Sequence, residues 1–259
     1  MLFQFTKSDT VRTAAFVALM KSGLDSAKTV AIEVALKSDH AELRHAALKY
    51  GLEMNIASLQ TGLAQAIGQM PVEDRLVVLA NIHQLKPAET AEKIALSCAA
   101  STEEDERVAA IVALGKIGTQ PAFFAVLQAV GEKSPRVSRI AAAALASMDY
   151  PAADTELLAM LKGDSSPAKV LAIKAVVVRQ IPGASEILID TITGSDASAA
   201  KEAVKSLYFI ATIDDLRALC TKAAATEDAA QKKSLSGLAS KLATRLDTDE
   251  ARELVAPLK

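Results

Sequence analysis

The sequence has few aromatic residues and no tryptophan. Its 259 residues include six phenylalanines and three tyrosines, so 3% of the chain is aromatic although 51% is hydrophobic. Alanine, leucine, valine and isoleucine must therefore form most of the interior. Side chains of this size suit thin helices in close contact better than a core filled by large rings. The composition favours closely packed helices.

The chain also lacks the cysteines of a disulfide framework. Its two cysteines, Cys98 and Cys220, lie in similar helical patterns roughly four repeats apart. In an extended array that separation exceeds the reach of a disulfide. We predict that both are buried and behave as small hydrophobic residues. Nothing in this pattern requires an oxidising compartment.

No sign of charge dominates the sequence. Lys and Arg number 29 and Asp and Glu 31, which gives a formal net charge of −2. A nucleic-acid partner is not expected, because such binding depends on a surplus of basic residues. Residues 1–9 lack a basic signal-peptide region, and the apolar stretch 14–20 is too short to span a membrane. We expect no membrane partner and a cytoplasmic location, although a protein whose signal had been removed would look the same.

A regular spacing of hydroxyl residues is the strongest positive feature. Thr102, Ser134, Ser166 and Ser198 follow one another at intervals of 32 residues, each just before an alanine-rich run. A hydroxyl side chain can accept hydrogen bonds from the free N–H groups of a helix start. We therefore predict that each caps a helix, and that one supersecondary unit repeats along the chain.

The remaining pattern extends this repeat over the whole chain. Repeats are expected to begin near residues 8, 39, 71, 102, 134, 166, 196 and 229, each as helix, turn and helix. Pro135 and Pro167 suit first helical positions, whereas Thr102 with Asp105 and Asp39 with Glu42 approximate capping boxes. We predict an all-α, right-handed α-solenoid of about eight repeats forming a single domain over residues 1–259.

The residues at several positions of the repeats resemble those of a known family. The first repeat has Val11-Arg12, Ala15 and Ala18-Leu19, and the fourth has Arg107, Ala113-Leu114-Gly115 and Ile117-Gly118. These positions resemble HEAT repeats, especially the short bacterial HEAT-like form found in bilin lyases. The longer form often carries a proline within the first helix and a ladder of Asp and Arg between repeats. We recognise neither in the sequence, which favours the short form.

The resemblance implies a function through protein contacts. In solenoids of this kind the second helices line a concave face that binds partners. The expected function is therefore a non-enzymatic scaffold for protein–protein interaction, with no cofactor or metal. A bilin-lyase-like chromophore attachment factor remains the alternative, because the short repeat form is similar to theirs.

Two possible catalytic motifs are incomplete in this sequence, so neither argues against a scaffold function. His40, His45 and His83 are not followed by glutamate, so they do not form the His-Glu pairs of a di-iron hydroxylase with this fold. The sequence from Gly115 to Gly118 lacks the flanking residues of a phosphate-binding loop. We interpret the histidines as surface or capping residues.

Two sets of residues are candidates for partner binding. Phe123 and Phe124 are adjacent on a predicted helix, so at least one should be partly exposed and could anchor an interface. Tyr208 and Phe209 are adjacent on another predicted helix, so at least one of them should also be partly exposed. Acidic residues gather on the predicted second helices of the C-terminal half: Asp154, Glu156, Glu186, Asp190, Asp214 and Asp215. They could bind a basic segment, or they could compensate the helix dipole at successive helix starts.

Overall fold

The computed structural model of the protein describes residues 8–22 and 25–258, and every regular element within them is a helix. Backbone contacts divide the chain into two compact units, Met1–Ala144 and Leu145–Lys259. We call these the first and second units and describe each by itself. That the repeats form one domain stays a prediction.

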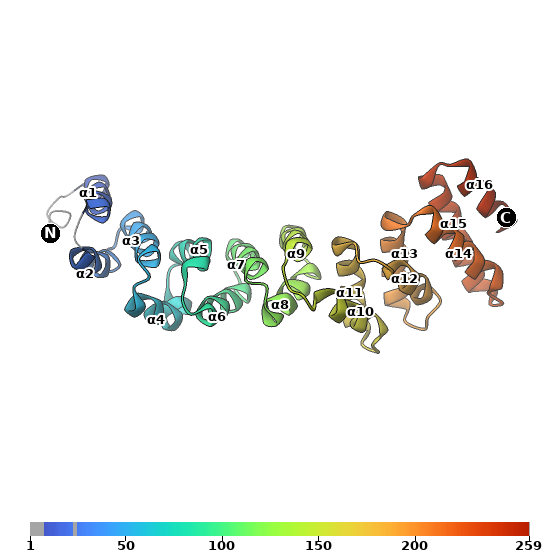
Figure 1. The fold of residues 1–259 in the computed structure, drawn as a ribbon, viewed down its shortest axis with the longest axis horizontal. Helices are drawn as coiled ribbons and strands as arrows, with labels where there is room; N and C mark the ends of the chain where they lie inside the picture. The colour runs from blue at the N-terminus through green and yellow to red at the C-terminus, as the bar shows by residue number, and fades with distance from the viewer. Residues whose placement is uncertain (1–7, 23–24, 259) are drawn as a thin grey trace. The chain divides into compact units, whose positions relative to one another are not determined.

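The first unit consists of paired helices joined by short turns (Figure 1). They are α1 (Asp9–Ser22), α2 (Asp25–Ala35), α3 (Ala41–Glu53), α4 (Ala57–Ala66), α5 (Val72–Ala80), α6 (Ala88–Ala99), α7 (Glu104–Ile117) and α8 (Gln120–Val130), with the 3₁₀ helices η2 (Ile67–Gln69) and η3 (Ile82–Gln84). Helix α9 (Pro135–Ser147) contains the boundary between the units.

The second unit continues the same alternation. Its helices are α10 (Ala153–Lys162), α11 (Ser166–Arg179), α12 (Ala184–Ile192), α13 (Ala197–Ile210), α14 (Ile213–Ala225), α15 (Ala229–Leu246) and α16 (Asp249–Val255), followed by η4 (Ala256–Leu258). Every predicted repeat start lies within two residues of the start of an odd-numbered helix.

Within each unit the helices form two layers. In the first unit α1, α3, α5 and α7 pack in succession, and α6 packs against both α4 and α8 (Figure 1). In the second unit α11, α13 and α15 form one layer, and α12, α14 and α16 form the other. Odd-numbered helices are thus the first helices of the repeats and even-numbered helices the second. This arrangement confirms the predicted α-solenoid of helix-turn-helix repeats.

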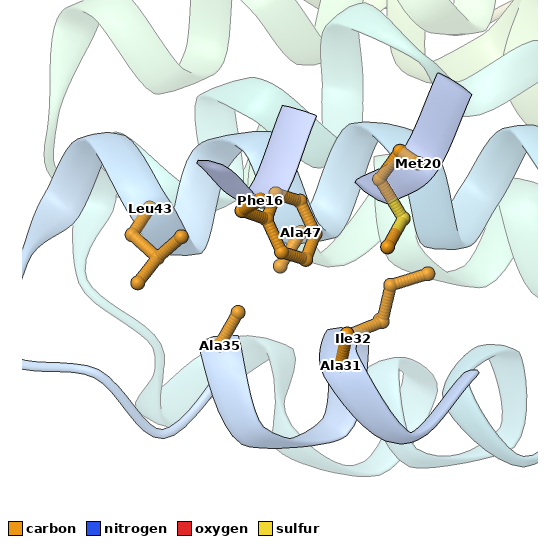
Figure 2. Close-up of a cluster of buried hydrophobic side chains, with 7 residues drawn as sticks. All are labelled: Phe16, Met20, Ala31, Ile32, Ala35, Leu43 and Ala47. Carbon is orange, nitrogen blue, oxygen red and sulfur yellow. The ribbon is translucent and has the colours of Figure 1, made fainter. Parts of the chain in front are cut away.

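Alanine side chains let the three helices α1, α2 and α3 meet in the core cluster around Phe16. In Figure 2, Phe16 and Met20 of α1 point toward Ile32 of α2 and Ala47 of α3. Phe16 and Ala47 are fully buried. Burying a side chain as large as Phe16 contributes about 2 kcal/mol through the hydrophobic effect. No pair of helices completes this cluster, because its residues come from two successive repeats.

Only one of the four predicted hydroxyl caps is correct. Ser134 Oγ accepts the backbone N–H of Val137, three residues into α9. Helix α7 instead begins after Glu103 and α11 after Ser165, while Asp196 caps α13 in place of Ser198. The spacing of 32 residues located the repeats correctly. The residue at which each helix begins, however, differs slightly from repeat to repeat. The neighbouring carboxylate of Asp196 accepts two N–H groups, which leaves Ser198 inside the helix.

The predictions for the other helix starts are also partly correct and partly wrong. Pro135 is the first residue of α9, as predicted, whereas Pro167 is the second residue of α11. The capping box predicted before α3 is wrong, because His40 occupies the cap position and accepts no hydrogen bond through its side chain. The one predicted before α7 is wrong for the same reason, since its cap residue is Glu103.

A ladder of ion pairs joins successive first helices, contrary to the sequence-based expectation. Arg44 Nε of α3 lies 2.8 Å from Asp74 Oδ2 of α5, and Arg75 Nη2 of α5 lies 2.7 Å from Glu106 Oε2 of α7. Both carboxylates are buried. The signal was present in the sequence, because Arg75 follows Arg44 by 31 residues and Asp74 directly precedes Arg75. Each acid, however, pairs with the arginine of the preceding repeat and not with its neighbour in sequence.

Candidate functional site

The predicted acidic residues of the second unit lie on or near the surface, and most have partners within the chain. Asp154 Oδ1 accepts a hydrogen bond of 2.6 Å from Arg179 Nε, and Asp190 pairs with Lys222. Glu156 Oε1 accepts a hydrogen bond of 2.6 Å from the hydroxyl of Tyr150. This bond, followed by burial of the hydroxyl, raises the pKa of Tyr150.

Asp215 has a local structural role. Its carboxylate accepts the backbone N–H of Thr212 at 2.8 Å, while the hydroxyl of Thr212 accepts the N–H of Asp215 at 3.4 Å. This reciprocal pair is a capping box at the start of α14. Asp214, in the same turn, pairs with Arg217 at 3.2 Å. The interpretation of these acids as compensation of helix starts therefore fits their positions.

Glu186, Asp190 and Asp214 are the exposed acids of the set, and Asp190 already pairs with Lys222 of the neighbouring helix α14. Glu186 lies in the first turn of α12, directly after the turn at Gly183, and its side chain is exposed. The side chain of Asp214 is 83% exposed. Glu186 and Asp214 belong to second helices, on neighbouring elements that pack together. They are the acids that a partner could reach at the least cost to the fold.

The two adjacent phenylalanines on α8 divide between core and surface, as their adjacency predicted. Phe123 is fully buried, whereas Phe124 is 39% exposed and meets Phe123 edge-on with 5.2 Å between ring centroids. Phe123 therefore cannot contact a partner directly, which corrects its place in the candidate set. Its role is to hold the ring of Phe124 at the surface.

A second exposed ring lies on α13. Phe209 is 72% exposed, far more than Phe124, and it packs edge-on against Tyr208 with centroids 5.6 Å apart. The guanidinium of Arg245 in α15 lies 5.8 Å from the centre of the Tyr208 ring and donates to the backbone carbonyl of Phe209 at 3.1 Å. The pair is thus fixed from the neighbouring first helix.

Buried polar groups in the first unit form structural clusters. Burial alone would raise the pKa of the Glu106 carboxyl, but hydrogen bonds from Ser101, Arg75 and Cys98 and the charge of Arg75 outweigh it and lower that pKa. Burial and the contact with Glu106 raise the pKa of Cys98 to about 12. A thiol with this pKa stays protonated at neutral pH and is a poor nucleophile. Cys220 is also buried, as predicted.

Two of the three histidines lie beside carboxylates. His40 Nε2 lies 2.9 Å from Asp9 Oδ1, and His45 Nε2 lies 3.0 Å from Asp74 Oδ1. In the described ranges, no three His, Cys, Asp or Glu side chains are grouped so as to hold a metal ion.

A groove opens beside α4 in the first unit. It encloses about 670 Å³ and has largely apolar walls that include Leu36, Leu59 and Leu63, with Arg44 and Asp74 at one side. Arg44 and Asp74 are already joined to each other by the ion pair between α3 and α5, and Ser38, Asp39, Ser58 and Gln69 are the other polar residues of the lining. The rest of the groove wall is apolar.

The lysines of the second unit were missed by sequence reasoning, which weighed the net charge of the whole chain. They gather on the first helices, opposite in sign to the acids on the second helices. Counting charge helix by helix would have revealed the segregation, because the helix boundaries were predicted closely.

Comparison with known protein families gives a match within the chain. Residues 92–176 match a family model described as HEAT repeats. This segment runs from α6 into α11. No curated protein matches the chain. Of the helices in the described part of the chain, none combines the length and the apolar character needed to cross a membrane.

Proposed function

We propose, from the match of residues 92–176 to HEAT repeats, that the chain acts as a non-enzymatic scaffold that binds a protein partner on the face of its second helices. Repeats of this family generally serve protein interaction. Stacked repeats bury their helices against their neighbours and leave the outer side of each layer for partners.

The outer side of α8 is the observation that carries this proposal. Helix α8 lies within the matched repeats and contains no Asp, Glu, Lys or Arg. Its exposed positions include Pro121, Phe124 and Gln128, which recur at helical spacing. Interface centres are depleted in charge and enriched in aromatic residues. Burying the exposed part of the Phe124 ring against a partner would contribute about 1 kcal/mol.

In the second unit, the accessible acids of the second helices extend the same idea to a basic segment. Glu186 and Asp214 lie on α12 and α14, which are neighbours in one layer. Attraction to Lys or Arg side chains would increase the association rate and weaken as salt is added. Asp215 is less suitable as a contact because its carboxylate is engaged in the capping box.

Replacing Phe124 with alanine tests the proposal. Proteins captured on the immobilised chain from cell extract would be identified by mass spectrometry for the wild type, Phe124→Ala and Val112→Ala. Val112 has the same 39% exposure but lies on the first helix α7, so its variant is the matched control. We expect Phe124→Ala to lose a partner that the control retains. Titration calorimetry with the purified partner should then show affinity about tenfold lower for Phe124→Ala.

A second pair of variants tests the acidic contacts. Glu186→Lys combined with Asp214→Lys should weaken binding of the same purified partner and flatten its salt dependence. Asp164→Lys, an exposed acid in the loop before α11, is the control. Equal affinities for all these variants would remove the second helices from the proposed interface. A spectral shift on adding a bilin to the purified chain would instead support the chromophore attachment factor.

A further inference from the structure

The two helix layers of the second unit carry opposite charge. The first helices α11, α13 and α15 contain nine Lys and Arg residues and one acid, Glu202. The second helices α10, α12, α14 and α16 contain nine acids and four basic residues. Because the net charge of the whole chain is only −2, this segregation is invisible in the overall composition.

The lysines share a face with the most exposed aromatic ring. On α13, Lys201, Lys205 and Phe209 are exposed at intervals of four residues, so they form one outward line. The corresponding line on α15 carries Lys233 and Lys241. The adjacent helix α11 contributes the half-buried Lys174, and α13 packs against both neighbours. We call these five lysines with Phe209 the lysine face.

The charge of this face is largely unneutralised. Lys205 Nζ lies 3.4 Å from Glu202, whereas no described residue forms an ion pair with the other four lysines. On the second helices, by contrast, Asp154, Asp190 and Asp214 all have basic partners. Neighbouring packed helices lie about 10 Å apart, so the lysines repel one another across a distance close to the screening length. An anionic partner would relieve that repulsion.

The two arginines of this layer donate hydrogen bonds to backbone carbonyl groups. Arg179 donates to the carbonyl oxygens of Leu145 at 2.7 Å and Met148 at 3.2 Å. Arg245 donates to the carbonyl of Phe209 and, through its other nitrogen, to that of Ala211. Arg245 thereby fixes the backbone that presents the Phe209 ring. The ring is exposed yet its position is set before any partner arrives.

We propose that the lysine face binds an acidic segment of a partner protein, with an apolar side chain of that segment packed on Phe209. Carboxylates of the segment would pair with the lysines, and its apolar side chain would shield the ring of Phe209 from water. This face lies on the first helices and is separate from the second-helix face of the proposed function.

The chemistry favours a protein segment over nucleic acid or a membrane. Single-stranded nucleic acid stacks successive bases on several rings, whereas the lysine face has one prominent ring. Arginine is the preferred residue for paired contacts to phosphate, and both arginines here are occupied by carbonyl groups. A membrane-binding face would present several large apolar side chains, and Phe209 is the only large hydrophobic residue of the described second unit that is strongly exposed.

Peptide titration of the full chain tests this assignment. The probe is a fluorescein-labelled peptide of alternating glutamate and serine with one central leucine, followed by fluorescence anisotropy. We expect binding at low salt that weakens as salt is added, and at least tenfold weaker binding when glutamine replaces glutamate. Lys201→Glu with Lys205→Glu should lower the affinity about tenfold or more, and Phe209→Ala should do so at every salt concentration.

Matched variants separate this face from other surfaces. Lys162→Glu reverses an exposed lysine of the second helix α10 and should leave peptide binding unchanged. Phe124→Ala, which tests the proposed function, should also leave it unchanged. All substituted side chains of the lysine face in this test are exposed, so the variants should keep the wild-type circular dichroism and melting temperature.

Three results would overturn the proposal. One is equal affinity for the glutamate and glutamine peptides. Another is tighter binding of single-stranded DNA or phosphatidylserine vesicles, lost on Lys201→Glu with Lys205→Glu. The third is self-association in sedimentation experiments that the same double variant abolishes, since this would make a second copy of the chain the partner.

Discussion

At the scale of single residues, buried charge defines how neighbouring repeats are joined. Glu106 is almost completely buried and accepts hydrogen bonds from Arg75 of the preceding first helix and from Ser101, at 2.7 and 2.6 Å. Breaking a buried ion pair leaves the other charge without compensation, which costs more than the pair itself contributes. Glu106 therefore connects α5 to α7 in a way that apolar contacts alone would not require.

Glu106→Gln should lower the free energy of unfolding by about 3 kcal/mol. Because the folded pKa of Glu106 is lowered, its contribution is present above the ordinary carboxyl pKa and is lost as the pH falls through the folded value. Urea unfolding at neutral and acidic pH should show a difference between wild type and variant that shrinks in acid. Glu103→Gln, an exposed neighbour, is the control and should match wild type. A constant difference at all pH values would contradict this account.

Residue roles were only partly predictable from the sequence. The adjacency of Phe123 and Phe124 required that one be exposed, but which one depended on how α8 rotates against its neighbours. The hydroxyl spacing likewise located repeats without locating caps. Ser134 caps α9, whereas Asp196 caps α13 because its carboxylate accepts the N–H groups of Ser198 and Ala199 and so starts the helix before Ser198. Which of two nearby side chains caps a helix depends on the local backbone geometry, and the spacing of residues in the sequence does not specify that geometry.

At the scale of helices, one glycine sets a close approach within the first unit. A Cβ atom on Gly115 of α7 would lie 2.9 Å from Cβ of Ala144 in α9 and 3.4 Å from its Cα. Glycine inside a helix costs up to about 1 kcal/mol relative to alanine. The cost is accepted here because the backbones are too close for another side chain. The same reasoning explains why these repeats contain so much alanine.

Gly115→Ala should therefore destabilise the protein by about 1 kcal/mol or more, despite the better helix propensity of alanine. Gly237 of α15 provides the matched opposite, because nothing lies within 4 Å of a Cβ placed there. Gly237→Ala should stabilise by about 0.5–1 kcal/mol. Thermal and denaturant unfolding of both variants would check the two signs. Stabilisation by both substitutions would show that Ala144 moves aside freely.

Helices and their pairing were the most predictable level, since the apolar rhythm and repeat length placed all the first helices within two residues. Contacts between repeats were less accessible. Arg44 and Asp74 are 30 residues apart, as are many residue pairs that never meet. Their pairing follows only once α3 and α5 are known to be adjacent. The charge segregation of the second unit follows from helix boundaries that were already available.

At the scale of the whole molecule, stability is shared between neighbouring repeats. First helices such as α3, α5 and α11 pack on the next first helix and on their own second helix, and the core cluster around Phe16 likewise belongs to more than one repeat. Stability in such arrays is approximately a sum of repeat and nearest-neighbour terms. A local defect should therefore weaken its neighbours most.

Leu207→Ala tests this distribution in the second unit. Leu207 of α13 is fully buried, so its truncation should cost about 3 kcal/mol. Hydrogen exchange followed by mass spectrometry should show the largest increase in α13 and its direct neighbours α11 and α12. Phe209→Ala, two residues later but exposed, should leave exchange nearly unchanged. An equal increase over every helix of the second unit would indicate a single cooperative block instead.

The opposite charges of the two layers also give the second unit an electric dipole moment across its thickness. A nearly neutral molecule with such a moment exerts little net pull on a distant ion, but it experiences a torque in the field of a charged partner. An acidic partner would turn the first helices toward itself before contact, and a basic one would turn the second helices. The protein should accordingly be retained on both anion and cation exchangers at low salt, each resin holding it by a different side.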